Sequence, residues 1–555
     1  MNKKVCSFPI LFALLALLIG TCAVVFPASA QAAPTSTGSI TVSGTVASSY
    51  DAYQIFSANV VDGDSDAKIA TDLAWASGAV RGAALPVLHS AGMSNSQTTA
   101  QEAAGWLNID SHLTSALSAQ LARSLQSSGA VSVALNAGTT AELPCGYWLI
   151  VADDDAIAQG EAGTAPIMAL VGGGAVTVKP KAATPKVAKH VLEDSAATWQ
   201  KAADATVGDD LYWRLSATVP AGLTAYDTYT VRFVDTMSAG LDPSKVAASM
   251  RVYVAAGADG GFDAVQTGKD GRAGTDPAKG WTDITAQCAT KVAADGTFTV
   301  RTGDLIAALG GADAFTAGAR VVAVYNAPLT SACNHGIAKG NPNEVYLRYP
   351  RSPFADQSGD AGFTRTPSDD ACAYTWDLAL TKRGSDGDKP LAGAVLSITD
   401  DRGRTLAADG TWDAEGKATV TTGEDGRVTV SGVDSGKLEV RELKAPKGYT
   451  AFEGTRSVTV KAEGLDVDQV AAAKPKLTIT AESPLRADSA DGSTGSLEAS
   501  LINTPTGTPP SITTGGFMPS TGDMAMYAAA AAAVAGAALI VVALLVKRGG
   551  GSHKE

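Results

Sequence analysis

The chain has 555 residues, a formal net charge of −13 at pH 7, and six cysteines. Its acidic residues are dispersed, which argues against a nucleic-acid partner and is typical of a soluble, exposed protein. The cysteines are too few to hold a chain of this length together, and the five histidines show no metal-ligand pair. We therefore expect no metal and no cofactor.

Residues 1–30 are predicted to be a secretory signal peptide. A basic start, Lys3-Lys4, precedes the apolar run Ile10–Ile19, and small residues lead to a cleavage site after Ala30. The mature chain is therefore expected to be exported.

Residues 31–180 show short alternating runs, such as Ser39–Val46, between Gly, Asp and Asn turns. This pattern is typical of sandwich strands and recurs further along the chain, so we predict an all-β protein of three tandem immunoglobulin-like β-sandwich domains. Apolar spacing of three or four predicts minor helix in the first domain, near Thr99–Leu107 and Ser111–Ser127. Prolines keep the segment Thr177–Pro185 extended as a linker to the next domain.

Residues 181–370 are predicted to form the middle sandwich, in which three strands each place one polar side chain on an apolar face. These side chains are Lys189, Asp235 and Asn343. A buried polar side chain is costly unless it is paired, so we expect the three to meet. Asn341 is a weaker choice than Asn343 because a proline follows it. Ordinary turn and edge positions are the alternative interpretation.

Four cysteines follow the predicted signal peptide, at Cys145, Cys288, Cys333 and Cys372. In an exported protein they allow three pairings, and the sequence does not choose among them. We expect a Cys288–Cys333 disulfide because both residues fall in the middle domain. Four free thiols are the alternative.

Residues 371–503 repeat the polar pattern with Lys382 on the first strand, Glu442 on an inner strand and Asn503 on the last strand. This set suits an amide condensation, in which a desolvated, neutral lysine attacks the asparagine carboxamide. A protonated Glu442 would polarise the carbonyl and relay the proton. The product is a Lys382–Asn503 isopeptide bond with loss of ammonia. A buried ion pair between Lys382 and Glu442 is the alternative.

Three signals follow in order at the C-terminal end. Residues 504–517 form a Pro/Gly/Thr-rich linker. The motif Met518-Pro519-Ser520-Thr521-Gly522 comes next, followed by a predicted transmembrane helix at 524–546 and a cytoplasmic tail at 547–555 that begins with two basic residues. This order resembles the cell-wall sorting signal of Gram-positive surface proteins, Leu-Pro-x-Thr-Gly. The resemblance implies that the transpeptidase sortase cuts between Thr521 and Gly522, and an ordinary tail anchor is the alternative.

Other motifs resemble those of Gram-positive pilins. The stretch from Val440 through Glu442 to Ala445-Pro446-x-Gly448-Tyr449 is similar to the E-box of the collagen-adhesin B-type domain. The middle domain resembles the second domain of backbone pilins, which implies a Lys189–Asn343 isopeptide bond with Asp235 as proton relay.

The linker segment Val176-Thr-Val-Lys-Pro-Lys181 is a partial match to the pilin motif that presents the lysine used in polymerisation. The resemblance implies Lys181 as the acceptor. Lys179 and Lys186 are alternatives, because a lysine occupies the motif's tyrosine position.

Over nearly its whole length, the chain resembles the major (shaft) pilin of a sortase-assembled pilus. That resemblance implies that Thr521 is joined to Lys181 of the next subunit, at the cell surface. It implies sortase, identical subunits, other pilins and peptidoglycan as partners, and it allows host surface ligands. The chain would be a substrate of sortase and not an enzyme, because its internal condensation is autocatalytic and single-turnover. A monomeric wall-anchored adhesin, a basal or tip pilin and, less favoured, a secreted hydrolase are the alternatives.

Overall fold

The computed structural model describes residues 36–507, apart from 65–66, 110, 181–183, 221–222, 258–260 and 268–272. The predicted signal peptide, Lys181, the sorting motif and the C-terminal apolar run lie outside the described residues. Within the described part of the chain, no helix has both the length and the apolar character to cross a bilayer.

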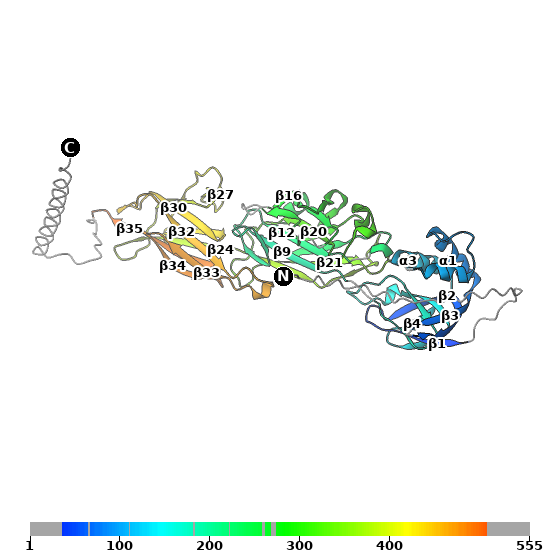
Figure 1. The fold of residues 1–555 in the computed structure, drawn as a ribbon. Coiled ribbons are helices and arrows are strands. Elements are labelled where there is room, and N and C mark those ends of the chain that lie inside the picture. The colour runs from blue at the N-terminus through cyan, green and yellow to red at the C-terminus, as the bar shows by residue number, and fades with distance from the viewer. Residues whose placement is uncertain are drawn as a thin grey trace, which may run out of the picture.

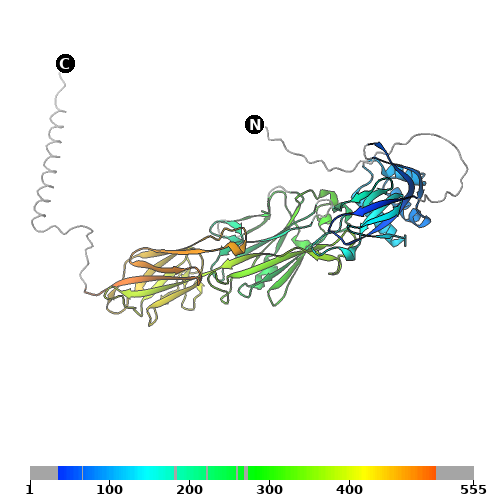
Figure 2. The ribbon, with the colours of Figure 1, turned by 90° about the horizontal axis from the view of Figure 1, so that it is seen from below.

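Three β-rich domains follow one another in a row, in chain order, and make an elongated molecule (Figures 1 and 2). The first domain lies at one end of the row and the C-terminal domain at the other. This arrangement confirms the prediction of tandem β-sandwiches with helix confined mainly to the first domain.

The first domain is built of two sheets and a helical layer. The smaller sheet has the order β5 (Thr140–Pro144), β1 (Thr37–Val42), β8 (Val176–Val178). The larger has the order β3 (Lys68–Trp75), β2 (Ser49–Asp62), β6 (Gly146–Ala152), β7 (Ile167–Val171), with β4 (Val133–Asn136) also paired to β2. The helical elements are α1 (Gly78–Ser90), α2 (Ala100–Leu107), α3 (Ser115–Ser127) and the 3-10 turn η2 (Asp154–Ala156). One face of the larger sheet packs on the helices and the other on the smaller sheet.

Two details of the helices differ from the sequence prediction. Helix α3 begins after Thr114, whose side chain accepts a hydrogen bond from the Leu117 N–H, so the expected start at 111 is too early. Helix α1 was not predicted. Its interior contains Pro86, a residue that normally ends a helix, and this masks the helical pattern.

The middle domain is a sandwich of two larger sheets with an added hairpin. One sheet has the order β10 (Thr198–Gln200), β9 (Val187–Glu193), β12 (Tyr212–Thr218), β20 (Arg320–Asn326), β14 (Arg251–Ala255), β17 (Thr282–Asp283). The other has the order β11 (Ala202–Asp204), β23 (Asp369–Tyr374), β21 (Asn341–Pro350), β13 (Arg232–Met237), β19 (Thr297–Arg301), β18 (Ala289–Val292), with β22 (Phe363–Arg365) paired to β21. The hairpin is β15 (Val265–Thr267) with β16 (Ala273–Pro277).

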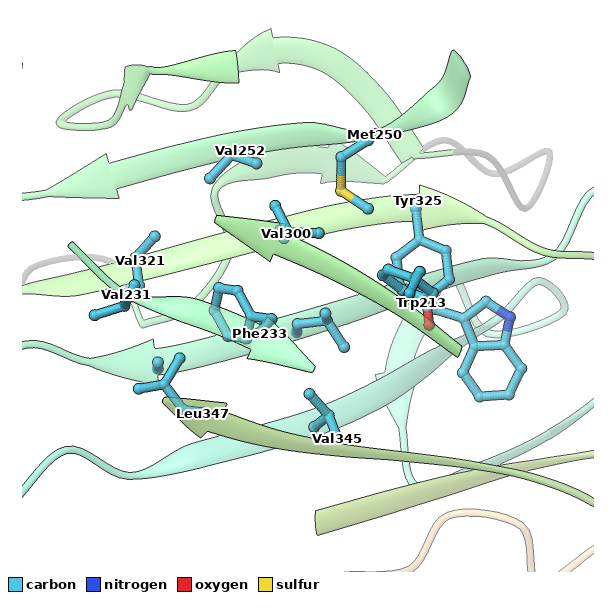
Figure 3. Packing of buried hydrophobic residues seen from close by; sticks show 14 of the residues in the cluster. Trp213, Val231, Phe233, Met250, Val252, Val300, Val321, Tyr325, Val345 and Leu347 are labelled. Atoms are coloured by element: carbon cyan, nitrogen blue, oxygen red, sulfur yellow. The ribbon is translucent and has the colours of Figure 1, made fainter. Parts of the chain in front are cut away.

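Short helical turns connect these strands: η3 (Leu223–Ala225), η4 (Pro243–Lys245), α4 (Val246–Ser249), η5 (Thr285–Gln287), α5 (Leu305–Ala308) and η6 (Ala312–Ala314). Figure 3 shows the apolar core between the two sheets, which contains Phe233, Val345 and Leu347 of one sheet and Tyr325 and Trp213 of the other.

The C-terminal domain is a second sandwich. One sheet has the order β29 (Arg427–Val433), β24 (Trp376–Gly384), β35 (Ser496–Pro505), β31 (Tyr449–Thr450), with β34 (Leu485–Asp491) also paired to β35. The other has the order β27 (Trp412–Asp413), β26 (Thr405–Leu406), β25 (Val395–Thr399), β30 (Gly436–Lys444), β32 (Thr455–Glu463), β33 (Lys476–Ala481), with β28 (Val420–Thr421) paired to β25 and the turn η7 (Val470–Ala472) before β33. The first and last strands, β24 and β35, are parallel neighbours.

The junction between the middle and C-terminal domains lies slightly beyond the predicted boundary. Residues 371–374, which the sequence assigned to the C-terminal domain, belong to β23 and pair with β21 and β11 of the middle domain. Thr375 alone separates β23 from β24. Across the junction, the Trp376 indole N–H donates to Asp204 Oδ2 at 2.6 Å, and Arg404 contacts both carboxylate oxygens of Asp209 at 2.5 and 2.8 Å.

The predicted Cys288–Cys333 disulfide is wrong, because all four cysteines of the described chain are free thiols. Cys288 immediately precedes β18, whose pairing through β19 places it beside Arg232, at the start of β13. Cys333 packs against Gly240, which follows the opposite end of β13. The two cysteines therefore lie at opposite ends of a six-residue strand of about 20 Å, well beyond the reach of a disulfide of about 7 Å.

Candidate functional site

The C-terminal domain brings together Lys382, Glu442 and Asn503, which come from β24, β30 and β35. Strand alternation turns each one inward: Lys382 continues the buried face of Leu378 and Leu380. Glu442 and Asn503 likewise occupy inward positions of their strands. The side chains of Lys382 and Glu442 are fully buried, and Asn503 is 2% exposed. The cluster thus lies in the core, between the two sheets.

Every polar atom that a condensation would use in this cluster has a partner. The Lys382 amine donates to Asn503 Oδ1 and lies 3.1 Å from Glu442 Oε1. The Asn503 amide nitrogen donates to both Glu442 oxygens, at 2.9 and 3.0 Å. Glu442 also accepts the Phe452 backbone N–H at 3.1 Å. A single carboxyl group therefore contacts the nucleophilic nitrogen and the nitrogen that would leave.

Burial sets the charge state of the lysine. It lowers the pKa of Lys382 to about 8, although the attraction of Glu442 opposes the shift. About a tenth of this amine is then neutral at pH 7, far more than for an ordinary lysine. Only a neutral amine can attack a carboxamide. The arrangement is chemically competent for amide condensation.

The middle domain holds the second cluster, in which Lys189 on β9 contacts Asp235 on β13. Both side chains are fully buried, as is Asn343 on β21. Lys189 and Asn343 both lie in the described part of the chain, and no hydrogen bond joins them. Both instead donate to the hydroxyl of Tyr325 on β20, at 2.9 Å from Lys189 Nζ and 2.8 Å from Asn343 Nδ2.

The charges of this second cluster are strongly perturbed. Burial lowers the pKa of Lys189 to about 8, against the attraction of Asp235, and raises the pKa of Asp235 to about 6. Burial also raises the pKa of Tyr325 well above its usual value, so its hydroxyl keeps its proton. Asp235 Oδ1 and Asn343 Oδ1 have no hydrogen-bond partner among the described residues.

Sequence reasoning missed Tyr325. Every residue of β20 is buried, so this strand has no polar face against which an inward side chain could be recognised. Asn341, the alternative to Asn343, makes ordinary structural bonds: its amide nitrogen donates to the backbone carbonyls of Asn334 and Ala373.

The remaining predicted site residues belong to polymerisation. Lys181 and the motif Met518-Pro519-Ser520-Thr521-Gly522 lie outside the described residues. Lys179, directly after β8, and Lys186, directly before β9, are both exposed. The described residues contain no cluster of three or more His, Cys, Asp or Glu that could hold a metal ion.

Comparison with known proteins finds one family model and several pilins. Residues 377–474 match the SpaA prealbumin-like fold domain. The trypsin-resistant surface T6 protein of Streptococcus pyogenes serotype M6 is 30% identical over 129 residues, so the match spans 22% of this chain and 22% of that relative.

Two solved structures of low sequence identity overlay on most of the chain. The T6 backbone pilin of Streptococcus pyogenes has a TM-score of 0.46 at 17% identity, and covers 85% of this chain and 98% of its own. The full-length major pilin SpaD of Corynebacterium diphtheriae has a TM-score of 0.40 at 14% identity, and covers 85% of this chain and 98% of its own. Residues 377–474 thus match the SpaA prealbumin-like fold domain, and the chain is similar to backbone pilins of Gram-positive bacteria.

Proposed function

We propose that this chain is the structural shaft subunit of a covalently polymerised surface pilus. The observation that carries the proposal is the buried cluster of Lys382, Glu442 and Asn503, in which Lys382 comes from the first strand of the C-terminal domain and Asn503 from the last. A bond there would join β24 directly to β35. Tension along the chain would then cross the domain through covalent bonds instead of through its hydrogen-bonded ladder.

The chemistry of the bond follows from the contacts. Nζ of neutral Lys382 attacks Cγ of Asn503, and the Cγ–Nδ2 bond breaks. Glu442 accepts a proton from Nζ and delivers one to Nδ2, which leaves as ammonia. Because Glu442 contacts both nitrogen atoms, it can make both transfers without moving far. The reaction is intramolecular and occurs once per molecule, so it is autocatalytic and single-turnover.

Polymerisation would join Thr521, near the C-terminal end of one subunit, to Lys181 in the linker between the first two domains of the next. A sortase thiolate would attack the Thr521 carbonyl and release Gly522 onward. Lys181 of the next subunit would then resolve the acyl-enzyme to leave a Thr521–Lys181 bond between subunits. The last subunit would pass to peptidoglycan, placing the polymer on the cell wall.

A blot of cell-wall extract tests this function. Extracts of the producing strain are boiled in SDS and probed with antibody against the middle domain. A shaft subunit gives a ladder of multimers that resists SDS, and a strain carrying Thr521→Ala gives no ladder. A single wall-linked band in the unmodified strain would contradict the proposal and favour a monomeric wall-anchored adhesin.

A further inference from the structure

The two buried clusters differ in how the acid reaches the leaving nitrogen. In the C-terminal domain, Glu442 touches the Asn503 amide nitrogen directly. In the middle domain, the shorter Asp235 makes no hydrogen bond to Asn343. What lies between them is the hydroxyl of Tyr325.

The Tyr325 hydroxyl contacts all three partners of the proposed middle-domain reaction. It accepts from Lys189 Nζ at 2.9 Å and from Asn343 Nδ2 at 2.8 Å, and donates to Asp235 Oδ2 at 3.2 Å. All four side chains are fully buried, so bulk water has no access to carry a proton between them. Figure 3 shows Tyr325 within the apolar core, beside Trp213.

We propose that Tyr325 is the proton relay of the middle domain, connecting Lys189 and Asp235 with the leaving nitrogen of Asn343. This inference rests on the proposed internal bond of that domain. In the middle domain a tyrosine would thus protonate the leaving nitrogen, a transfer that Glu442 makes directly in the C-terminal domain.

The protons balance without any further reactant. Nζ of neutral Lys189 bonds to Cγ of Asn343, and Tyr325 gives its hydroxyl proton to Nδ2 as the Cγ–Nδ2 bond breaks. Ammonia leaves. The surplus proton on Nζ returns to the tyrosine oxygen, directly or through Asp235, so tyrosine and acid end in their starting forms. The raised pKa of Tyr325 is consistent with a group that gives up its proton only while it gains another.

The test compares rates of bond formation in the whole ectodomain. Freshly synthesised chains are quenched in acid at intervals and digested, and the peptide that links Lys189 with Asn343 is quantified by mass spectrometry. Tyr325→Phe should slow this bond on the order of 100-fold, the usual contribution of a positioned acid–base group. The Lys382–Asn503 bond of the same molecules serves as an internal reference and should form at the normal rate.

Two further variants separate a relay from a structural role. Tyr253→Phe removes another buried hydroxyl of the same domain, bonded to the Thr275 carbonyl at 2.7 Å, and should leave both bonds unaffected. Asp235→Glu combined with Tyr325→Phe lengthens the acid by the methylene group that Glu442 has, and should restore much of the rate. Circular dichroism verifies that each variant is folded.

The outcomes are distinct. If Tyr325→Phe forms the middle bond at the normal rate, Asp235 acts directly and the relay is wrong. If the double variant is folded but stays as slow as Tyr325→Phe, the hydroxyl does not act as a relay. If the unmodified chain lacks the middle bond yet forms the C-terminal one, the proposed middle bond itself fails and the relay fails with it.

Discussion

The amine of Lys382 and the carboxamide of Asn503 meet across the first and last strands of one domain. Lys382 donates a hydrogen bond to Asn503 Oδ1, although the two residues are 121 positions apart in the chain. The parallel pairing of β24 with β35 produces this contact, because it sets Lys382 opposite Leu501 and Gly384 opposite Asn503.

The mass of the purified ectodomain should report the internal bonds. Each bond releases one ammonia, so the chain should weigh about 17 Da less than its sequence mass for one bond and about 34 Da less for two. Intact mass spectrometry under reducing conditions measures this deficit. Glu442→Ala should recover one ammonia while the middle-domain bond persists. A full sequence mass for the unmodified chain would rule out both bonds.

Asn503→Ala should lower the stability of the C-terminal domain. A bond that closes a loop of more than 100 residues is expected to contribute about 4–5 kcal/mol by restricting the unfolded chain. We expect the melting temperature to fall by at least about 10 °C in calorimetry. Ser500→Ala, which removes a buried hydroxyl from the same strand, should cost only about 1 kcal/mol. Equal effects of the two changes would show that no crosslink is lost.

The rate at which the Lys189–Asn343 bond forms should have a bell-shaped dependence on pH. The reaction needs a neutral Lys189 amine and a protonated Asp235, which returns a proton to the Tyr325 oxygen as it takes the surplus proton from Nζ. Lys189 and Asp235 must therefore share a single titratable proton. Below the Asp235 pKa of about 6 both groups are protonated, and above the Lys189 pKa of about 8 both have lost their protons. The rate of linked-peptide formation should be flat between these values and fall on either side. A rate that rises steadily from pH 5 to 10 would exclude Asp235 as the acid.

Lys181→Ala should abolish the SDS-resistant ladder but leave monomer attached to the wall, because Thr521 remains a sortase substrate. Thr521→Ala should lose both products. Lys179→Ala and Lys186→Ala are the matched controls, since both lysines are exposed and flank the site. If the ladder survives Lys181→Ala and disappears in one of these controls, that neighbour is the acceptor. If the triple variant still polymerises, the linker does not supply the acceptor.

Thiol chemistry should confirm the absence of disulfides from the described chain. Ellman's reagent in denaturant should titrate four thiols in the mature protein, at Cys145, Cys288, Cys333 and Cys372. A reducing agent should leave the melting temperature unchanged. Two titratable thiols together with a drop in melting temperature on reduction would contradict the structure.

The sequence predicted the sandwich architecture and the C-terminal cluster for a simple reason. Lys382, Glu442 and Asn503 each continue a buried apolar face whose residues alternate with more polar ones, and such a face can be recognised in a single chain. The expected proximity of the three follows because buried polar groups must find partners. Strand alternation and the cost of burying a polar group therefore suffice to predict that these three side chains meet.

Two features could not be predicted in the same way. Tyr325 lies on a strand buried on both faces, where alternation carries no information about which sheet a side chain meets. Shared domain membership is the only basis in the sequence for pairing Cys288 with Cys333, and the structure places them at opposite ends of strand β13. The distance between two residues of one domain depends on strand register and strand order, and neither can be read directly from the sequence.

The short passage from β23 to β24 has a mechanical consequence. Thr375 is fully buried and is the only residue between a strand of the middle domain and the first strand of the next. The contacts of Trp376 with Asp204 and of Arg404 with Asp209 hold the flanking surfaces together. Because this joint contains no slack, the two domains resist swivelling and bend as one stiff segment. We therefore expect the elongated molecule to bend at places other than this joint.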